Sequence, residues 1–527
     1  MKKYEEVLKK IKYALEIILA SIALLLTFIL CLSAILKTSY ANNMIEQRML
    51  IEGERFIQSL VFLAAFLLIG FFIVKVADEE RLKYLLGFTL GLHMAYGIIM
   101  ILFARSAPGA DALTVFKMAT QLAEGDLSFV NSTDSYLSYY PQQVGLTAFL
   151  ALLVKIISVI PFEVSSHHFI KGFYCILNAV TIYFAYRTLK ETKWNVKICA
   201  AFLYLSIINL PFAMYSSFIY GEIPSLTAIT VSAYFFSRLV REKGIKVINM
   251  IASALFLALA VFIRKNSLIF VIAVAITAVL LFLESGKKYI YLIFIALCLA
   301  LSISILPVTQ KLIEKKAGDE ISSGVTMYSY LAMGMQEGNR GPGWYNGFNF
   351  DTYCNTGMNT DLTNEIAYEA IEERKEYFKN DPKAFVEFYR DKFLTQWSDP
   401  TLASCQATYA DFGGRSEFMN ELYDGKYYPI YVTVCNLLQN AVYIGALLWT
   451  ILNMISVLKD RKFRDNAFIY LGIITVIGGF IFHMFWEANS RYVFPYFCML
   501  IPYAAMGYGS LFKAKHKRKR NDDWDDE

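Results

Sequence analysis

The sequence predicts an all-α polytopic membrane protein with about twelve transmembrane helices, outer interfacial helices and one long outer loop that contains helices. Three observations lead to this fold class. Of the 527 residues, 56% are hydrophobic and only 18% are charged, whereas about a quarter of a soluble domain is charged. Apolar runs long enough to cross a bilayer recur along the chain. One long polar stretch, near 310–430, separates two groups of these runs.

The apolar runs define the elements in chain order. Runs of roughly 17 to 25 residues are long enough to span a bilayer. The first follows the basic segment MKKYEEVLKKIKY and is too long for a signal-peptide core, so we interpret it as an uncleaved span that enters from the cytoplasm. The candidates lie near 14–36, 55–76, 84–104, 142–161, 168–187, 196–218, 223–240, 247–263, 267–283, 289–309, 431–458, 467–485 and 492–512.

The distribution of basic residues indicates which run does not cross. If all thirteen crossed, the two basic termini would lie on opposite faces of the membrane. If residues 142–161 instead lie along the outer interface, four basic loops (RTLKETKWNVK, REKGIK, ESGKK and KDRKFRD) and the tail all face inward. We therefore expect twelve spans, with both termini cytoplasmic.

These spans divide the chain into five parts. Each part is bounded by a change from apolar to polar sequence. They are the first two spans (1–83), a transmembrane core with a first outer loop at 105–167 (84–309), a large outer loop or lid (310–430), the C-terminal spans (431–512) and a charged cytoplasmic tail (513–527).

We interpret the long loop as a lid rather than as an independent enzyme domain, because it is too short to form a large hydrophobic core of its own. Its first half is rich in glycine and aromatic residues, in YSYLAMGMQEGNRGPGWYNGFN. A helix is predicted over 361–379, with Asp361 or Thr363 near its start, and a second begins at Asp381-Pro382. Trp344, Tyr345 and Trp397 are the candidate lid or acceptor-binding residues.

Asp111 is the first candidate catalytic residue. It follows a Pro108-Gly109 turn just outside the third span and precedes an amphipathic helix predicted over 112–123. One interpretation is that Asp111 only caps this helix. The other is that it is a base fixed at the edge of the bilayer, able to take a proton from an acceptor hydroxyl.

Four further charged residues are expected on the same outer side. Glu222 is either solvated at the interface or part of the site, as a second catalytic acid. Arg264 and Lys265 interrupt two apolar runs where the charge bias would not place them, which favours pairing with phosphate or carboxylate. Arg491 suits a phosphate because of its planar fork, although a structural pair with Glu487 or snorkelling would also place it there.

Together these residues predict transfer of a sugar from a polyprenyl-phosphate donor to a hydroxyl acceptor. Arg491, Arg264 and Lys265 would bind the donor phosphate, while Asp111 and Glu222 would supply the catalytic acids. The sequence has no Walker loop, GxSxG or HExxH motif, and its cysteines show no metal-ligand spacing. We expect no nucleotide cofactor and no nucleic-acid partner, and we leave a divalent metal requirement open.

The chain resembles the GT-C superfamily of membrane glycosyltransferases over most of residues 84–512. The similarity is to bacterial relatives of protein O-mannosyltransferases and to the aminoarabinose transferase of lipid A. In that family an outer-loop acid precedes an interfacial helix and then a Tyr-Pro-led second one, which matches Asp111, 112–123 and 141–161. The family's second outer acid corresponds to Glu222.

Two later motifs extend the resemblance. The segment KFLTQWSDP (392–400) is similar to a loop element of Gram-positive members, and Asn489-Ser490-Arg491-Tyr492 with Pro495 is similar to their closing Arg-Tyr motif. Two extra N-terminal spans and a single acid at Asp111, where the family usually has a pair, are departures. The resemblance implies an outward-facing glycosyltransferase whose acceptor is a cell-envelope glycan, lipid or protein.

Two other functions are compatible with a twelve-span protein. A transporter or lipid-saccharide flippase would be expected to show two similar halves and charges in mid-span, neither of which is evident. An O-antigen polymerase or ligase would place basic and histidine residues in its large loop, whereas this loop carries more Asp and Glu than Lys and Arg.

Overall fold

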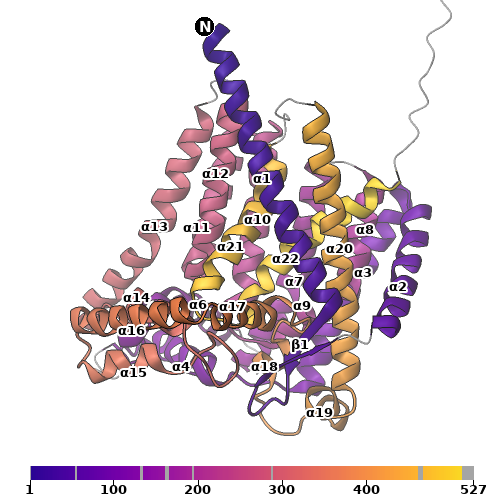
Figure 1. Cartoon of the computed structure of the whole chain (residues 1–527). Helices are drawn as coiled ribbons and strands as arrows, with labels where there is room; N and C mark the ends of the chain where they lie inside the picture. The colour runs from indigo at the N-terminus through magenta and orange to yellow at the C-terminus, as the bar shows by residue number, and fades with distance from the viewer. Residues whose placement is uncertain are drawn as a thin grey trace, which may run out of the picture.

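The computed structural model describes residues 2–53, 56–130, 135–160, 165–192, 195–285, 289–460 and 467–512. Long helices stand side by side in a bundle, and shorter helices and loops form a layer across one end of it (Figure 1). The N-terminus lies at the opposite end of the bundle from this layer. The predicted charged tail, 513–527, lies outside the described residues.

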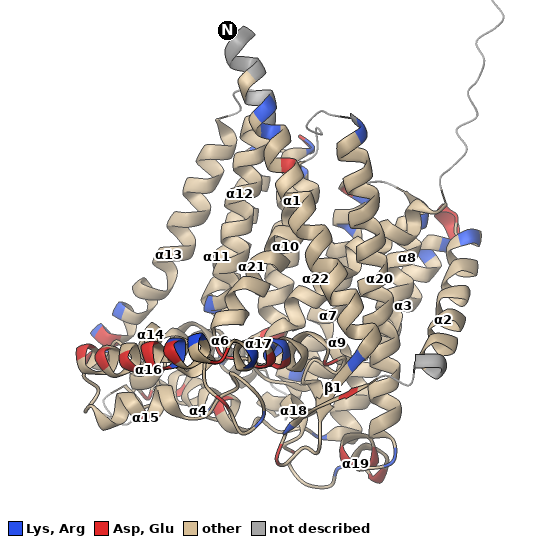
Figure 2. Cartoon of the chain, in the orientation of Figure 1, with Lys and Arg blue, Asp and Glu red and all other residues tan. Residues whose placement is uncertain are grey.

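Among the residues that the structure describes, twelve helices form the bundle. Their apolar sequences leave few charges along their middle sections, as Figure 2 shows. They are α1 (Lys2–Leu36), α2 (Phe56–Val76), α3 (Glu79–Ile99), α7 (Ser166–Thr192), α8 (Val196–Ile207), α10 (Glu222–Val240), α11 (Lys246–Ile263), α12 (Leu268–Ser285), α13 (Ile290–Ala317), α20 (Tyr428–Asp460), α21 (Leu471–Phe485) and α22 (Ser490–Ser510).

A multi-pass membrane protein is confirmed. In the part of the chain that the structure describes, eleven helices are long and apolar enough to cross a membrane, or twelve if one bent pair counts as a span. The eleven include α6 (Val144–Ser158) together with the residues just before it. They do not include α22, which contains Pro495 and Pro502 but runs within the bundle (Figure 1).

The predicted span 196–218 is broken. Its two parts, α8 and α9 (Leu210–Met214) with a following 3-10 turn, meet at an angle of 62°. Asn209 begins the second part by accepting a hydrogen bond from the backbone N–H of Phe212. Pro211 lies in the first turn, where its missing N–H costs least. The break turns the chain toward the layer that carries the site.

Helix α6 begins and ends on the side of the bundle that carries the layer. At its start, a Cβ on Gly145 would meet the carbonyl oxygen of Phe262, at the layer end of α11. After α6, the chain enters α7 beside the layer, because the His167 ring lies 4.8 Å from the ring of Phe412 in the long loop. The helix packs mainly along α4 (Ala110–Glu124). Its composition would allow a crossing, but its two ends do not lie on opposite sides.

The layer is built mostly from the long polar loop. The predicted helices at 361–379 and from Asp381-Pro382 are confirmed, although Asn359 caps the first of them and Asp381 the second. The structure adds several short helices. The layer comprises α5 (Tyr136–Tyr139), α14 (Met327–Gly334), α15 (Phe348–Asn355), α16 (Thr360–Asn380), α17 (Pro382–Trp397), α18 (Ser404–Thr408) and α19 (Glu417–Asp424), together with α4 and α6.

A β-hairpin between α1 and α2 was not predicted. Strands β1 (Lys37–Ala41) and β2 (Met49–Gly53) pair antiparallel, with Lys37 opposite Gly53. The hairpin is tied to the layer, since Ser39 N–H donates to the carbonyl of Ser398 and Met49 N–H to that of Arg340. The hairpin between the first two spans therefore supports the long loop that contains the candidate lid.

Candidate active site

A cavity of about 940 Å³ lies where the bundle meets the layer. Segments from almost the whole chain line it, from the hairpin at Gln47 to the turn between α21 and α22. Six of the eight predicted site residues are on its wall, and they share a position at the end of a helix or in a loop. They are Asp111, Arg264, Lys265, Trp344, Tyr345 and Arg491.

Asp111 is exposed in this cavity and does not cap its helix. Gly109 occupies the N-cap position of α4, and Asp111 lies in the first turn. The close approach of Gly109 to Ala410 explains the small residue, because a Cβ there would lie 3.0 Å from the Ala410 Cβ. A carboxylate in the first turn is favoured by the helix dipole. The capping interpretation from the sequence is therefore wrong, and the carboxylate is free to face the cavity.

Glu222 lies behind the cavity wall and holds two arginines. It is 1% exposed and begins α10. Its Oε1 atom lies 2.8 Å from Arg264 Nη1 and 3.5 Å from Arg491 Nε. Arg264 reaches this carboxylate because α11 ends at Ile263 and Arg264 itself is extended. Glu222 is thus neither solvated nor on the cavity surface. It fixes two arginines, Arg264 and Arg491, that line the cavity.

Aromatic rings enclose the Arg491 guanidinium. Its central carbon lies 5.5–5.6 Å from the ring centroids of Phe218, Tyr220 and Tyr492, and Tyr492 also faces Arg264 at 5.6 Å. Cation–π contacts of this kind stabilise a guanidinium without neutralising its charge. The two arginines therefore share a single carboxylate, and the cluster of Glu222, Arg264 and Arg491 keeps one net positive charge beside the cavity.

Glu487 is a second cavity carboxylate, which the sequence offered only as a structural partner of Arg491. It lies in the turn between α21 and α22 and lines the cavity. Burial raises the pKa of Glu487 to about 7. Arg491 opposes that rise, the negative charge of Asp111 adds to it, and a hydrogen bond with Tyr492 favours the ionised form. Two acids from α4 and from this turn thus act on one another across the site.

Trp344 and Tyr345 belong to a loop fixed against the same turn. Ala488 N–H donates to the carbonyl of Gly343 at 2.7 Å, and the Trp344 indole N–H donates to Thr395 Oγ1 at 3.0 Å. The buried Lys392 Nζ donates to the carbonyls of Gly334 and of Trp486, the latter at 2.8 Å. Burial lowers the pKa of the Lys392 ammonium to about 7. The loop is held by hydrogen bonds to α17 and the turn, as one wall of the cavity.

Trp397 does not belong to the site. It is fully buried at the end of α17, where its ring packs beside Phe480 and Tyr496. Its carbonyl accepts hydrogen bonds from Gln439 and Tyr443 of α20. It does not line the cavity where an acceptor would bind, because the end of α17 packs on α21 and α22 of the bundle. Trp397 anchors the layer instead.

Several cavity residues could not be identified from the sequence. Asn349 is 1% exposed and lines the cavity, and within the described residues its Nδ2 has no hydrogen-bond partner. Both amide atoms of Gln406 are also buried without partners there. Arg340, Tyr140 and Tyr330 complete the wall. The stretch rich in glycine and aromatic residues contains Tyr330, Arg340 and Asn349, but its composition did not indicate which of its residues face the cavity.

The site offers charged and amide groups in a partly enclosed cavity at the edge of an apolar bundle. Among the residues described, no group of three or more His, Cys, Asp or Glu side chains is arranged to hold a metal ion. No protein-family model matches the chain, and no curated protein has a significantly similar sequence. Function must therefore be argued from the site.

Proposed function

We propose that the chain is a membrane glycosyltransferase that moves a sugar from a polyprenyl-phosphate donor to a hydroxyl acceptor on the outer face of the membrane. One observation carries this proposal. A carboxylate, Asp111, and a fixed arginine pair, Arg264 and Arg491, face one cavity at the boundary between an apolar bundle and a polar layer. A lipid-linked substrate needs this boundary, because its chain must stay in the membrane while its sugar meets a polar acceptor.

The arginine cluster suits the donor phosphate. The phosphate that links a sugar to a lipid is a diester with a single negative charge, and the Glu222–Arg264–Arg491 cluster carries one net positive charge. Arginine forks bind phosphate oxygens bidentately. Lys265 and Arg340 line the same cavity and would assist. Fixed cations lower the barrier most where charge develops, which is on the departing phosphate.

Asp111 is the proposed base. The acceptor oxygen attacks the anomeric carbon, and the bond between that carbon and the phosphate oxygen breaks. The phosphate leaves with the electron pair, while the acceptor's proton passes to the Asp111 carboxylate. Glu222 takes no proton in this scheme, because two arginines occupy its buried carboxylate. Its role is to position them.

The cavity walls support a sugar substrate. Tyr140, Tyr330, Trp344 and Tyr345 supply flat apolar faces, and Asn349 and Gln406 supply amide groups for hydroxyls. Small-molecule sites typically combine apolar walls with a few placed polar groups. The loop that carries Trp344 forms one side of this enclosure and would restrict water near the reacting carbon.

The membrane arrangement is part of the proposal. The layer faces outward, α4 and α6 lie along the outer interface, and the termini are cytoplasmic in a bacterial plasma membrane. The positions of both ends of α6 beside the layer support this GT-C-like arrangement. The acceptor would be a cell-envelope glycan, lipid or protein.

The direct test uses purified protein in detergent, a radiolabelled polyprenyl-phosphate sugar and a cell-envelope extract as acceptor. We expect a covalently labelled product that Asp111→Asn does not form. A flippase would give no product in detergent, because no second leaflet exists there. Mass spectrometry of lipid-linked sugars and surface glycans in a deletion strain should then show an accumulated donor and a missing sugar. A deletion strain with unchanged glycans, together with no transfer in detergent, would overturn the proposal.

A further inference from the structure

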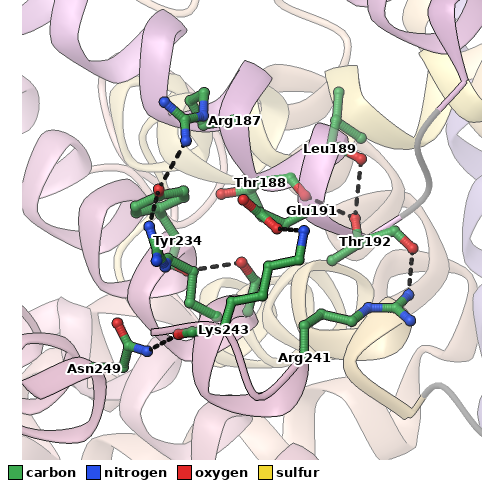
Figure 3. Close-up of polar contacts among 11 residues, drawn as sticks. Arg187, Thr188, Leu189, Glu191, Thr192, Tyr234, Arg241, Lys243 and Asn249 are labelled. Atoms are coloured by element: carbon green, nitrogen blue, oxygen red, sulfur yellow. Dashed lines mark hydrogen bonds and ion pairs between the residues drawn. The ribbon is translucent and has the colours of Figure 1, made fainter. Parts of the chain in front are cut away.

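A second pair of arginines lies at the end of the bundle opposite the cavity. Arg187 is near the end of α7, and Arg238 is near the end of α10, the helix whose first residue is Glu222. Figure 3 shows Arg187 and Tyr234 pointing toward one another, with a Lys243–Glu191 ion pair beside them. None of these residues lines the candidate active site.

Both guanidinium groups converge on one phenol oxygen. Arg187 Nη2 donates to Tyr234 Oη at 3.1 Å, and Arg238 Nη1 donates to the same oxygen at 3.0 Å. Arg187 Nη1 donates to Tyr183 Oη at 2.8 Å. The central carbon of Arg187 lies 5.4 Å from the Tyr234 ring centroid, and that of Arg238 lies 5.8 Å from it. Two like charges are thereby held side by side in a fixed orientation.

The neighbouring carboxylates form no direct ion pair with these two arginines, although Glu191 acts on Arg187 electrostatically at longer range. Glu191 is bound by Lys243 at 2.6 Å, and Glu242 is bound by Lys246 at 3.3 Å. Arg241, the next cation along, donates to the carbonyl of Thr192. Within the described residues, neither Arg187 nor Arg238 has a carboxylate at ion-pair distance. A counter-charge from outside the chain would relieve their mutual repulsion.

Arg238 also carries an unused donor. Its Nε is buried and has no hydrogen-bond partner among the described residues. The turn after α10 limits its movement, because a Cβ on Gly244 would lie 2.9 Å from Arg238 Nη2. A ligand that accepts from Nε and a terminal nitrogen together would fit the guanidinium fork.

We propose that Arg187 and Arg238 bind the phosphate of an anionic phospholipid in the leaflet next to this end of the bundle. Arg238 lies in the last turn of α10 and Arg187 lies five residues before the end of α7, at the depth of lipid headgroups. The apolar side chains of Ile245, Val247 and Ile248 are exposed beside the turn that covers Arg238 and provide a surface for acyl chains. Basic clusters at this depth favour anionic lipids, whereas a free anion would have no use for the apolar surface.

The test is native mass spectrometry of the full-length protein in detergent, with phosphatidylglycerol added. We expect wild type to retain this lipid in preference to phosphatidylcholine, and millimolar inorganic phosphate not to displace it. The double variant Arg187→Gln/Arg238→Gln should bind it more weakly, by about fivefold for each arginine. The charge-preserving double variant Arg187→Lys/Arg238→Lys should also lose affinity, because a point charge replaces the fork.

Control variants distinguish a specific lipid-binding site from non-specific attraction to a basic surface. Arg241→Lys, on the same face but outside the pair, should bind phosphatidylglycerol as wild type does. If size-exclusion chromatography shows that a double variant misfolds, lipid binding is measured on Tyr234→Phe instead. This variant keeps the ring packing and releases both arginines from their shared oxygen. Equal retention of phosphatidylcholine, full displacement by inorganic phosphate, or wild-type binding in the lysine variant would each overturn the proposal.

Discussion

Helix α10 joins two arginine pairs, and only the first of them has a carboxylate in direct contact. At its first residue, Glu222 holds Arg264 and Arg491 through one buried carboxylate, and aromatic rings surround the pair. At its far end, Arg187 and Arg238 share the Tyr234 hydroxyl and no described carboxylate. The first pair is compensated by a direct ion pair before any substrate arrives, whereas the second meets only the longer-range field of Glu191, which Lys243 already binds.

This difference indicates which arginine pair suits catalytic turnover of a substrate and which suits retention of a bound lipid. A phosphate held by two arginines with no carboxylate in contact is bound tightly throughout, which does not raise a rate. A pair already balanced to one positive charge matches a singly charged diester and stabilises the further charge that develops on the departing phosphate. We therefore expect chemistry at the carboxylate-containing end and stable lipid binding at the other. The following predictions test that division, beginning with the largest effect.

Asp111→Asn should abolish most transfer activity. Removal of a general base typically lowers the rate by about a hundred- to ten-thousandfold. Because Gly109 rather than Asp111 occupies the N-cap, the substitution should cost little stability. Initial transfer rates at saturating donor measure the loss of activity, and thermal unfolding checks that the variant is folded. Asp126→Asn, at the other end of the same helical segment, is the matched control and should retain wild-type rates. A rate for Asp111→Asn within a few-fold of wild type would show that Asp111 is not the catalytic base.

Glu222→Gln should destabilise the protein more than any change at the second pair. It leaves two arginines beside a neutral amide, and breaking a buried ion pair typically costs about 3–5 kcal/mol. Tyr234→Phe removes only a neutral acceptor and should cost about 1 kcal/mol. Chemical unfolding of both variants in the same detergent compares them. Equal losses would mean that the carboxylate does not distinguish the two pairs.

Arg491→Lys should raise the KM for the donor by about tenfold. The substitution keeps the charge but replaces a bidentate fork by a point charge, and a hydrogen bond to a charged group is worth about 1.5–3 kcal/mol. Steady-state kinetics with varied donor concentration measure the effect. Arg241→Lys, which makes the same exchange away from the cavity, serves as the control and should change KM little. A donor KM unaffected in Arg491→Lys would place the phosphate elsewhere.

Donor binding should weaken as the pH rises through 7. Burial raises the pKa of Glu487 to about 7, so this carboxyl is largely neutral at pH 6 and ionised at pH 8. Once ionised beside Arg491, it competes with the donor phosphate, and we expect donor KM to rise by about fivefold over this range. Because the folded pKa is raised from 4.5, the stability contribution of protonated Glu487 is present below pH 4.5 and lost toward pH 7.

Glu487→Gln tests the assignment of that pH dependence. The variant should bind donor equally at pH 6 and pH 8 while keeping the hydrogen-bonding shape of the side chain. If the pH dependence persists in Glu487→Gln, another group must be responsible. Lys392, whose pKa burial lowers to about 7, is the next candidate, because it fixes the loop that carries Trp344.

Single cysteines introduced at the surface should have almost no effect on activity. They should report which side of the membrane each end of the helix bundle faces. In a Cys354→Ser background, an impermeant thiol reagent applied to intact cells should label cysteines at Asp126, Glu369 and Lys426. It should not label cysteines at Lys243 or Lys246 until the cells are opened. Labelling of the second group from outside would invert the membrane arrangement and place the lipid site in the outer leaflet.

The candidate site was only partly predictable. Asp111, Arg264, Lys265 and Arg491 were found because a charge at the end of an apolar run conflicts with its surroundings, and that conflict is visible in a short window. Glu222 was found for the same reason, but its place behind two arginines was not predictable from the sequence. Glu487 was not predicted as a site residue, because four residues before Arg491 it looked like that arginine's structural partner.

The sequence by itself determined the multi-pass helical bundle, the boundaries of most helices and the position of the long polar layer. Hydrophobicity and helix capping act over a few residues, so these features can be read locally. Only the tertiary structure decided that Trp397 is buried, that the N-terminal hairpin supports the layer, and that Glu222 meets Arg264 and Arg491. These contacts join residues far apart in the chain, and their free energy depends on burial and distance, which no local pattern encodes.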